Sequence, residues 1–69
     1  MTRTTKNINI RENNNGFAIY NNGQVVMTVG GIATAKAQAI ALAKVENKGV
    51  VVATDYYTER LSAKKVATL

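Results

Sequence analysis

The fold of this chain is decided by the stretch FAIYNNGQVVMTV, residues 17–29. It contains Asn22-Gly23 between two runs rich in β-branched and aromatic residues. An Asn-Gly pair is the preferred sequence of a tight β-hairpin turn, because both residues accept a positive φ. The stretch therefore predicts two antiparallel strands, over residues 17–20 and 24–29. Alternation along the second strand places Val25, Met27 and Val29 on one side and Gln24, Val26 and Thr28 on the other.

A third strand is expected before this hairpin. Residues 7–12, NINIRE, alternate polar and apolar side chains, and the Asn-rich residues 13–16 predict a turn. Ile8 and Ile10 would then share an inner face with Phe17 and Ile19. The outer face of the predicted sheet would carry mainly amide and hydroxyl groups, from Asn7, Asn9, Arg11, Ala18, Tyr20, Gln24, Val26 and Thr28.

The second half of the chain predicts a helix and a further strand. The alanine-rich residues 32–47 have high helix propensity, with Thr34 as the expected N-cap and Gly49 as the expected C-terminal stop. A helical wheel places Leu42, Val45, Ala41 and Ala35 on one broad face. The continuous apolar run 50–53 predicts a central strand. Residues 54–69 fit a short helix, an extra edge strand or a mobile tail.

These elements predict an α+β fold. A small antiparallel sheet in the order β-β-β-α-β would have one helix packed on one face, followed by an uncertain C-terminal element. A chain of 69 residues allows only one domain, residues 1–69, and its ends (residues 1–6 and 59–69) are the segments expected to be mobile.

The composition argues against an enzyme. The chain has no Cys and no His, so a disulfide, a Cys or His metal site and a His-based acid–base pair are all excluded. Asp55 and Glu59 would share a face only in a helix, and Gly30-Gly31 lacks the spacing of a phosphate-binding loop. We therefore expect no catalytic residues, no metal and no cofactor.

The hydropathy pattern predicts a cytoplasmic protein, with no membrane partner. Residues 32–45 form the longest mainly apolar stretch, which is too short and too polar to span a bilayer. The polar N-terminus does not resemble a secretory signal.

Basic residues cluster towards the two ends of the chain. The chain has nine Lys and Arg against four Asp and Glu, a net charge of +5. If the first strand and the tail are neighbours, their cations form one positive patch that attracts nucleic acid or an acidic protein. A charge surplus that keeps a small protein soluble is the alternative. The cations concerned are Arg3, Lys6 and Arg11 at one end and Arg60, Lys64 and Lys65 at the other.

Two segments carry a family resemblance. Residues 15–23, NGFAIYNNG, and residues 34–43, TAKAQAIALA, resemble small bacterial and phage β-β-β-α-β domains of unknown function, with Phe17 at the position of a typical Trp and Ala35 at that of a typical Lys. The same run is similar to the arm-type DNA-binding domain of phage and transposon tyrosine recombinases. In that family a three-stranded sheet, backed by one helix, enters the major groove. The resemblance implies DNA contacts from Arg11, Tyr20, Gln24 and Thr28.

The first functional hypothesis is a small non-enzymatic binding protein of phage or mobile-element type. It would act as an inhibitor that occludes a host or defence macromolecule, either a protein or a nucleic acid. The alternative is a sheet-based DNA-binding domain or small transcriptional regulator. Homodimerisation through the tail or the first strand is also expected to be accessible, because Leu61, Val66 and Leu69 add apolar surface and an edge strand is exposed. The candidate contact residues are Arg11, Tyr20, Gln24, Thr28, Arg60, Lys64 and Lys65.

Overall fold

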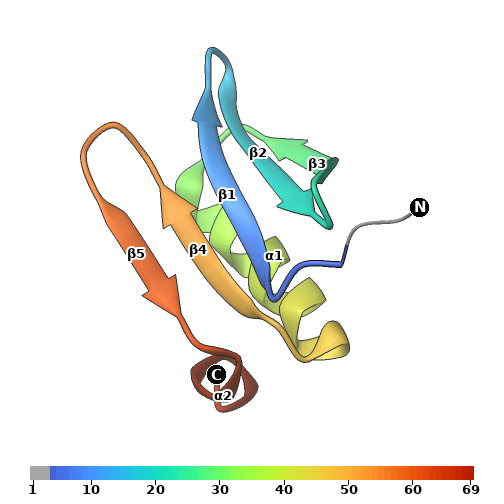
Figure 1. Cartoon of the computed structure of the whole chain (residues 1–69). Helices are drawn as coiled ribbons and strands as arrows, with labels where there is room; N and C mark the ends of the chain where they lie inside the picture. The colour runs from blue at the N-terminus through green and yellow to red at the C-terminus, as the bar shows by residue number, and fades with distance from the viewer. Residues whose placement is uncertain (1–3) are drawn as a thin grey trace.

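Five strands form one sheet in the computed structural model, which describes residues 4–69. The strands lie in the order β3-β2-β1-β4-β5, and α1 packs behind one face (Figure 1). This arrangement confirms the expected α+β class. The sheet is mixed, because β1 and β4 pair in parallel while the other pairs are antiparallel. The elements are β1 (Asn7–Asn13), β2 (Gly16–Asn21), β3 (Gln24–Val29), α1 (Ile32–Glu46), β4 (Gly49–Ala53), β5 (Thr58–Leu61) and α2 (Ala63–Ala67).

The β2–β3 hairpin has the predicted turn but not the predicted alternation. Asn22 and Gly23 have φ values of 56° and 81°, as a tight hairpin turn requires. The register then shifts within β3, from Tyr20 opposite Val25 to Ile19 opposite Met27, which leaves Val26 as a bulge. The extra residue breaks the period of two. Val25 therefore shares the side of Tyr20, and the expectation that Val26 lies on that side is wrong.

The first strand lies at the centre of the sheet. Ile10 of β1 is opposite Ile19 of β2 and Val52 of β4, and all three are buried. The predicted inner face is thus confirmed. Because β1 has strand neighbours on both sides, it offers no free edge, and dimerisation through the first strand is ruled out in this fold.

Helix α1 meets the sheet through its smallest side chains. Ala35, Ala39 and Ala43 are fully buried and recur every four residues, on one face of the helix. Of the broad face that the helical wheel groups, Ala35 is fully buried and Leu42 packs against the core, but Val45 is 80% exposed. The face that packs is the one that lets the helix backbone come close to the strands.

The helix ends also differ from expectation. The N-cap is Gly31 and has no side-chain hydrogen bond, so Thr34 is not the cap. The C-cap is Asn47, with a left-handed φ of 57°. Gly49 instead belongs to β4, where a Cβ atom would lie 2.5 Å from the carbonyl oxygen of Leu61 and 2.6 Å from Asn7 Oδ1. Close packing in the sheet, rather than helix termination, requires glycine there.

The C-terminal segment forms both an edge strand and a short helix. Ser62 caps α2, because its Oγ accepts a hydrogen bond from the Lys65 backbone N–H at 3.1 Å. Val66 is fully buried and Leu61 packs against the core. These two side chains therefore do not add to the exposed apolar surface. Of the N-terminal segment expected to be mobile, residues 1–3 lie outside the described residues.

A buried polar cluster joins the β2–β3 turn to the C-terminal end of α1. Lys48, which is 7% exposed, donates to Asn21 Oδ1 at 2.6 Å and to Asn22 Oδ1 at 2.8 Å. Its Nζ also lies 3.1 Å from Glu46 Oε1, and Asn21 Nδ2 donates to both Glu46 oxygens. A buried ammonium group is costly unless it is paired and hydrogen-bonded, and this one is both. The cluster therefore fixes the hairpin against the helix.

Glu46 makes the stability of this cluster depend on pH. Hydrogen bonds from Asn21 and Lys48 hold the pKa of its carboxyl below the ordinary 4.5. The folded state therefore binds this proton less readily than the unfolded chain. The stabilisation is present above the ordinary pKa and is lost as the pH falls through the folded-state value.

We expect Glu46→Gln to unfold at a lower temperature than the wild type near neutral pH, with the gap closing as the solution is acidified below the ordinary carboxyl pKa. Thermal unfolding followed by circular dichroism across that range measures the gap. A gap of constant size from neutral to acidic pH would contradict the role of the Glu46 charge.

The alanine contact predicts a site that does not tolerate larger side chains. Ala39→Leu should lower the free energy of unfolding by about 1–3 kcal/mol through overpacking. Ala37→Leu, at an exposed position of the same helix, is the control and should change it by only a few tenths of a kcal/mol. Urea unfolding of both variants makes the comparison, and equal losses would show that α1 does not pack closely at Ala39.

Candidate binding face of the sheet

The sheet face opposite α1 is uncovered in the described part of the chain. Figure 1 looks onto this face, with α1 behind the sheet and α2 at one end of it. We call it the open face. Strand register assigns it these residues: Asn7, Asn9, Arg11, Ala18, Tyr20, Val25, Thr28, Val51, Ala53, Thr58 and Arg60.

Register brings the two arginines of the strands onto this one face. Arg60 is opposite Val51, which is opposite Asn9, and Asn9 is opposite Tyr20. Arg11 lies two residues further along β1 than Asn9. Only β4 separates β1 from β5, so about 10 Å of sheet lies between the strands that carry the arginines. The first strand and the tail are therefore near neighbours. This is the condition under which their cations can form one positive patch.

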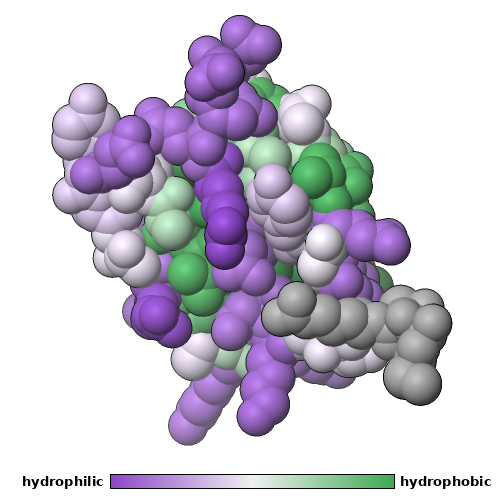
Figure 2. Space-filling view, turned by 45° about the horizontal axis from the view of Figure 1, so that its top comes forward, coloured by the Kyte–Doolittle hydropathy of each residue, from purple (hydrophilic) through white to green (hydrophobic). Residues whose placement is uncertain are grey.

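Arg11 and Tyr20 form the aromatic part of the open face. The Arg11 guanidinium carbon lies 5.8 Å from the centroid of the Tyr20 ring, within the range of a cation–π contact. Both side chains stand beside the small, buried Ala18 and the amide of Asn9. Seen from the tilted direction of Figure 2, hydrophilic side chains run across the middle of the molecule with apolar surface on both sides.

A second cluster of positive charge lies where β5 meets α2. A hollow of about 520 Å³ is lined by Arg60 and Lys65 together with Asn7, Val51, Leu61 and Ser62. Two cations from different elements thus line the same depression at the end of the open face. Lys64 is exposed on α2 but does not line this hollow.

No acidic residue belongs to the open face by strand register. Glu46 is paired with Lys48, and Glu59 with Lys36 of α1 at 2.8 Å. The hydrogen bond to Glu59 raises the pKa of Lys36, which marks this as an ion pair on the helix side. Glu12 accepts a hydrogen bond from the Asp55 backbone N–H at 3.4 Å, at the end of the sheet that carries the β4–β5 turn. Positive charge on the open face therefore has no acidic neighbour within it.

The structure unites most of the predicted contact residues. Arg11, Tyr20, Thr28 and Arg60 lie on the open face, and Lys65 lies at its end. The expectation that Gln24 lies there is wrong. It is opposite Asn21, whose side chain bonds to α1, and residues that flank a two-residue turn share a face.

Two further members of the open face were not predicted. Val51 belongs to a run of three valines, VVV, so alternation of polar and apolar residues cannot assign its side chain to a face of the sheet. Val25 reaches the open face only because of the β3 bulge. A strand pairing of β4 with β1 is needed to place Val51, and nothing in a single sequence supplies that pairing.

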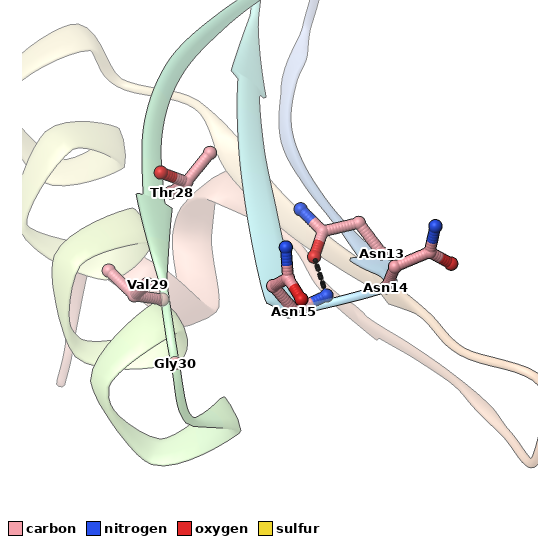
Figure 3. A pocket seen from close by; sticks show the side chains of 6 residues that line it. All are labelled: Asn13, Asn14, Asn15, Thr28, Val29 and Gly30. Atoms are coloured by element: carbon pink, nitrogen blue, oxygen red, sulfur yellow. Dashed lines mark hydrogen bonds between the residues drawn. The ribbon is translucent and has the colours of Figure 1, made fainter.

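A second hollow, of about 560 Å³, lies between the β1–β2 turn and the end of β3. Figure 3 shows Asn13 and Asn15 joined by a hydrogen bond from the Asn15 backbone N–H to Asn13 Oδ1, while the Asn14 side chain points away from Thr28 and Val29. The lining contains amides and a hydroxyl but no titratable group. It can accept and donate hydrogen bonds, but it offers no charge for recognition of an ion.

The remaining carboxylates do not form a reactive pair. Asp55 lies in the turn after β4, and Glu59 lies in β5 with Lys36 as its partner. Among residues 4–69, no group of three or more acidic side chains is placed to hold a metal ion. Over the same residues, neither helix has the length and apolar character needed to cross a membrane.

Comparison of the chain with protein-family models, with curated proteins and with solved structures found no match.

Proposed function

We propose that this chain is a small non-enzymatic binding protein that covers a site on another macromolecule with its open face. The observation that carries the proposal is the separation of charge. Arg11 and Arg60 share an uncovered sheet face, and no acidic residue belongs to that face by strand register. Such a face attracts a negatively charged surface over a distance of about one Debye length, roughly 8–10 Å at moderate salt.

The partner we propose is an acidic surface of a host protein. Arginine and tyrosine are enriched at the energetic centres of protein interfaces, and the open face presents both beside Val51 and the asparagine amides. Two arginines on a flat face are few for a protein that tracks a phosphate backbone. The proposed setting is that of an accessory protein of phage or mobile-element type, acting as an inhibitor in the host cytoplasm.

Nucleic acid is the second candidate, and one observation favours it. The hollow beside β5 places Arg60 and Lys65 together with the Ser62 side chain, a combination that suits a phosphate group. Salt separates the two candidates. Phosphate contacts weaken steeply as ionic strength rises, because counterions are released on binding, whereas an interface with an apolar centre weakens less.

We expect the tagged full-length chain to retain one host protein from a bacterial lysate, with nuclease present or absent. The double variant Arg11→Ala/Arg60→Ala should reduce that retention at least about tenfold, since hot-spot arginines contribute about 1–2 kcal/mol or more each. Quantitative mass spectrometry of the bound material measures the retention.

A charge-matched control distinguishes a specific role of the open face from a general effect of lowering the net charge. Lys36→Gln/Lys44→Gln removes the same two charges from α1 and should leave retention unchanged, with thermal unfolding confirming that both variants fold. Bound nucleic acid that disappears with nuclease and leaves no protein behind would select the second candidate. Equal losses in the two double variants would contradict a role for the open face.

A further inference from the structure

We infer that two copies of this chain pair edge to edge through β3, as antiparallel strands related by a two-fold axis. The pairing would extend one sheet across both copies. It would also bring together two apolar grooves that each copy leaves open beside β3.

Strand β3 is an edge whose only protection against strand addition is the bulge at Val26. It pairs only with β2, and within residues 4–69 no other strand lies along its outer side. Its sequence, QVVMTV, has no charge and no proline, and five of its six residues are exposed. Edge strands normally carry charged residues, because a free row of backbone N–H and C=O groups pairs readily with another strand.

The opposite edge of the sheet shows the contrast. Strand β5 has only four residues, TERL, and two of them are charged. Its Glu59 is held by Lys36, and its chain continues directly into α2. The β5 edge is therefore protected by charge, by its short length and by α2, whereas the β3 edge has only its bulge.

An apolar groove follows the exposed edge. It measures about 440 Å³ and lies between β3 and α1, with Val26 and Met27 on one wall and Ala41, Leu42 and Val45 on the other. Val26 is 49%, Met27 40% and Val45 80% exposed. The bulge turns Val26 from the open face towards this groove, so the strand edge and the groove form one continuous apolar surface.

The distribution of charge permits a second copy as the occupant. Each copy carries a net charge of +5, so two copies repel each other wherever their cations face. The groove lining and β3 contain no charged residue at all, which makes this the surface where like-charged copies approach at least cost. An acidic partner would gain nothing from an uncharged surface and is better served by the open face.

The two-fold geometry fits the rest of the molecule. Antiparallel pairing of identical edge strands is isologous, so each β3 is both the added strand and its template. A two-fold axis perpendicular to the sheet keeps both open faces on the same side. The paired molecule would thus present two copies of Arg11 and Arg60 to one partner surface, which raises avidity without a new contact.

Light scattering after size exclusion tests the pairing. We expect the wild type to have twice the 7.4 kDa monomer mass at concentrations on the order of 100 µM. Val26→Lys and Val45→Glu should give the monomer mass with an unchanged circular dichroism spectrum, since both positions are exposed. Thr58→Lys, which adds a charge to the other edge, should stay dimeric. A wild type that is monomeric throughout would overturn the inference.

A cross-linking experiment locates the contact independently of stability. Because the chain has no cysteine, any disulfide between two copies must form through the one introduced thiol. Val26→Cys and Met27→Cys lie at the centre of β3, close to the expected two-fold axis, and should form a disulfide-linked dimer on mild oxidation. Thr58→Cys should not. Cross-linking through Thr58→Cys, or none at either β3 position, would show that β3 is not the interface.

Discussion

The close contact between α1 and one face of the sheet is the constraint on which the rest of the structure depends. Three buried alanines, Ala35, Ala39 and Ala43, bring the helix backbone against strands whose inner side chains are isoleucine and valine. One helix of fifteen residues can cover only one face of a five-stranded sheet. The open face and the exposed β3 edge both follow from this limit. The short α2 adds Val66 to the core but lies at one end of the sheet.

The same contact determines which charged residues lie on which side of the sheet. Carboxylates pair with lysines on the helix side: Glu46 with the buried Lys48, and Glu59 with Lys36. The Glu59–Lys36 pair ties the β5 edge to α1. Hydrogen bonds of Glu46 and Lys48 with the asparagines of the turn tie the hairpin to the same helix. The arginines of the strands are left on the other face, without acidic neighbours there. Three surfaces of different character result: a positive open face, a neutral apolar edge at β3 and a paired, near-neutral helix side.

Local signals in the sequence predicted most of the helices and strands. The features that could not be predicted depend on contacts between residues far apart in the sequence. Asn22-Gly23 marked the hairpin because its turn depends only on the φ values of those two residues. The bulge at Val26 was missed because it depends on pairing with β2. Of the candidate site, Arg11 and Tyr20 followed from alternation along their own strands. The position of Arg60 on the face of Arg11 needed two further pairings. These are the antiparallel pairing of β4 with β5 and the parallel pairing of β1 with β4 across the helical crossover.

We propose that the open face, and not the helix side, recognises a negatively charged partner. Titration of the isotope-labelled chain with a short heparin oligosaccharide, a polyanion that mimics any acidic partner, tests it by amide NMR shifts. We expect shifts to concentrate at Asn9, Arg11, Tyr20 and Arg60, with α1 unaffected. Shifts concentrated at Lys36 and Lys44 of α1, with the open face unchanged, would contradict the account.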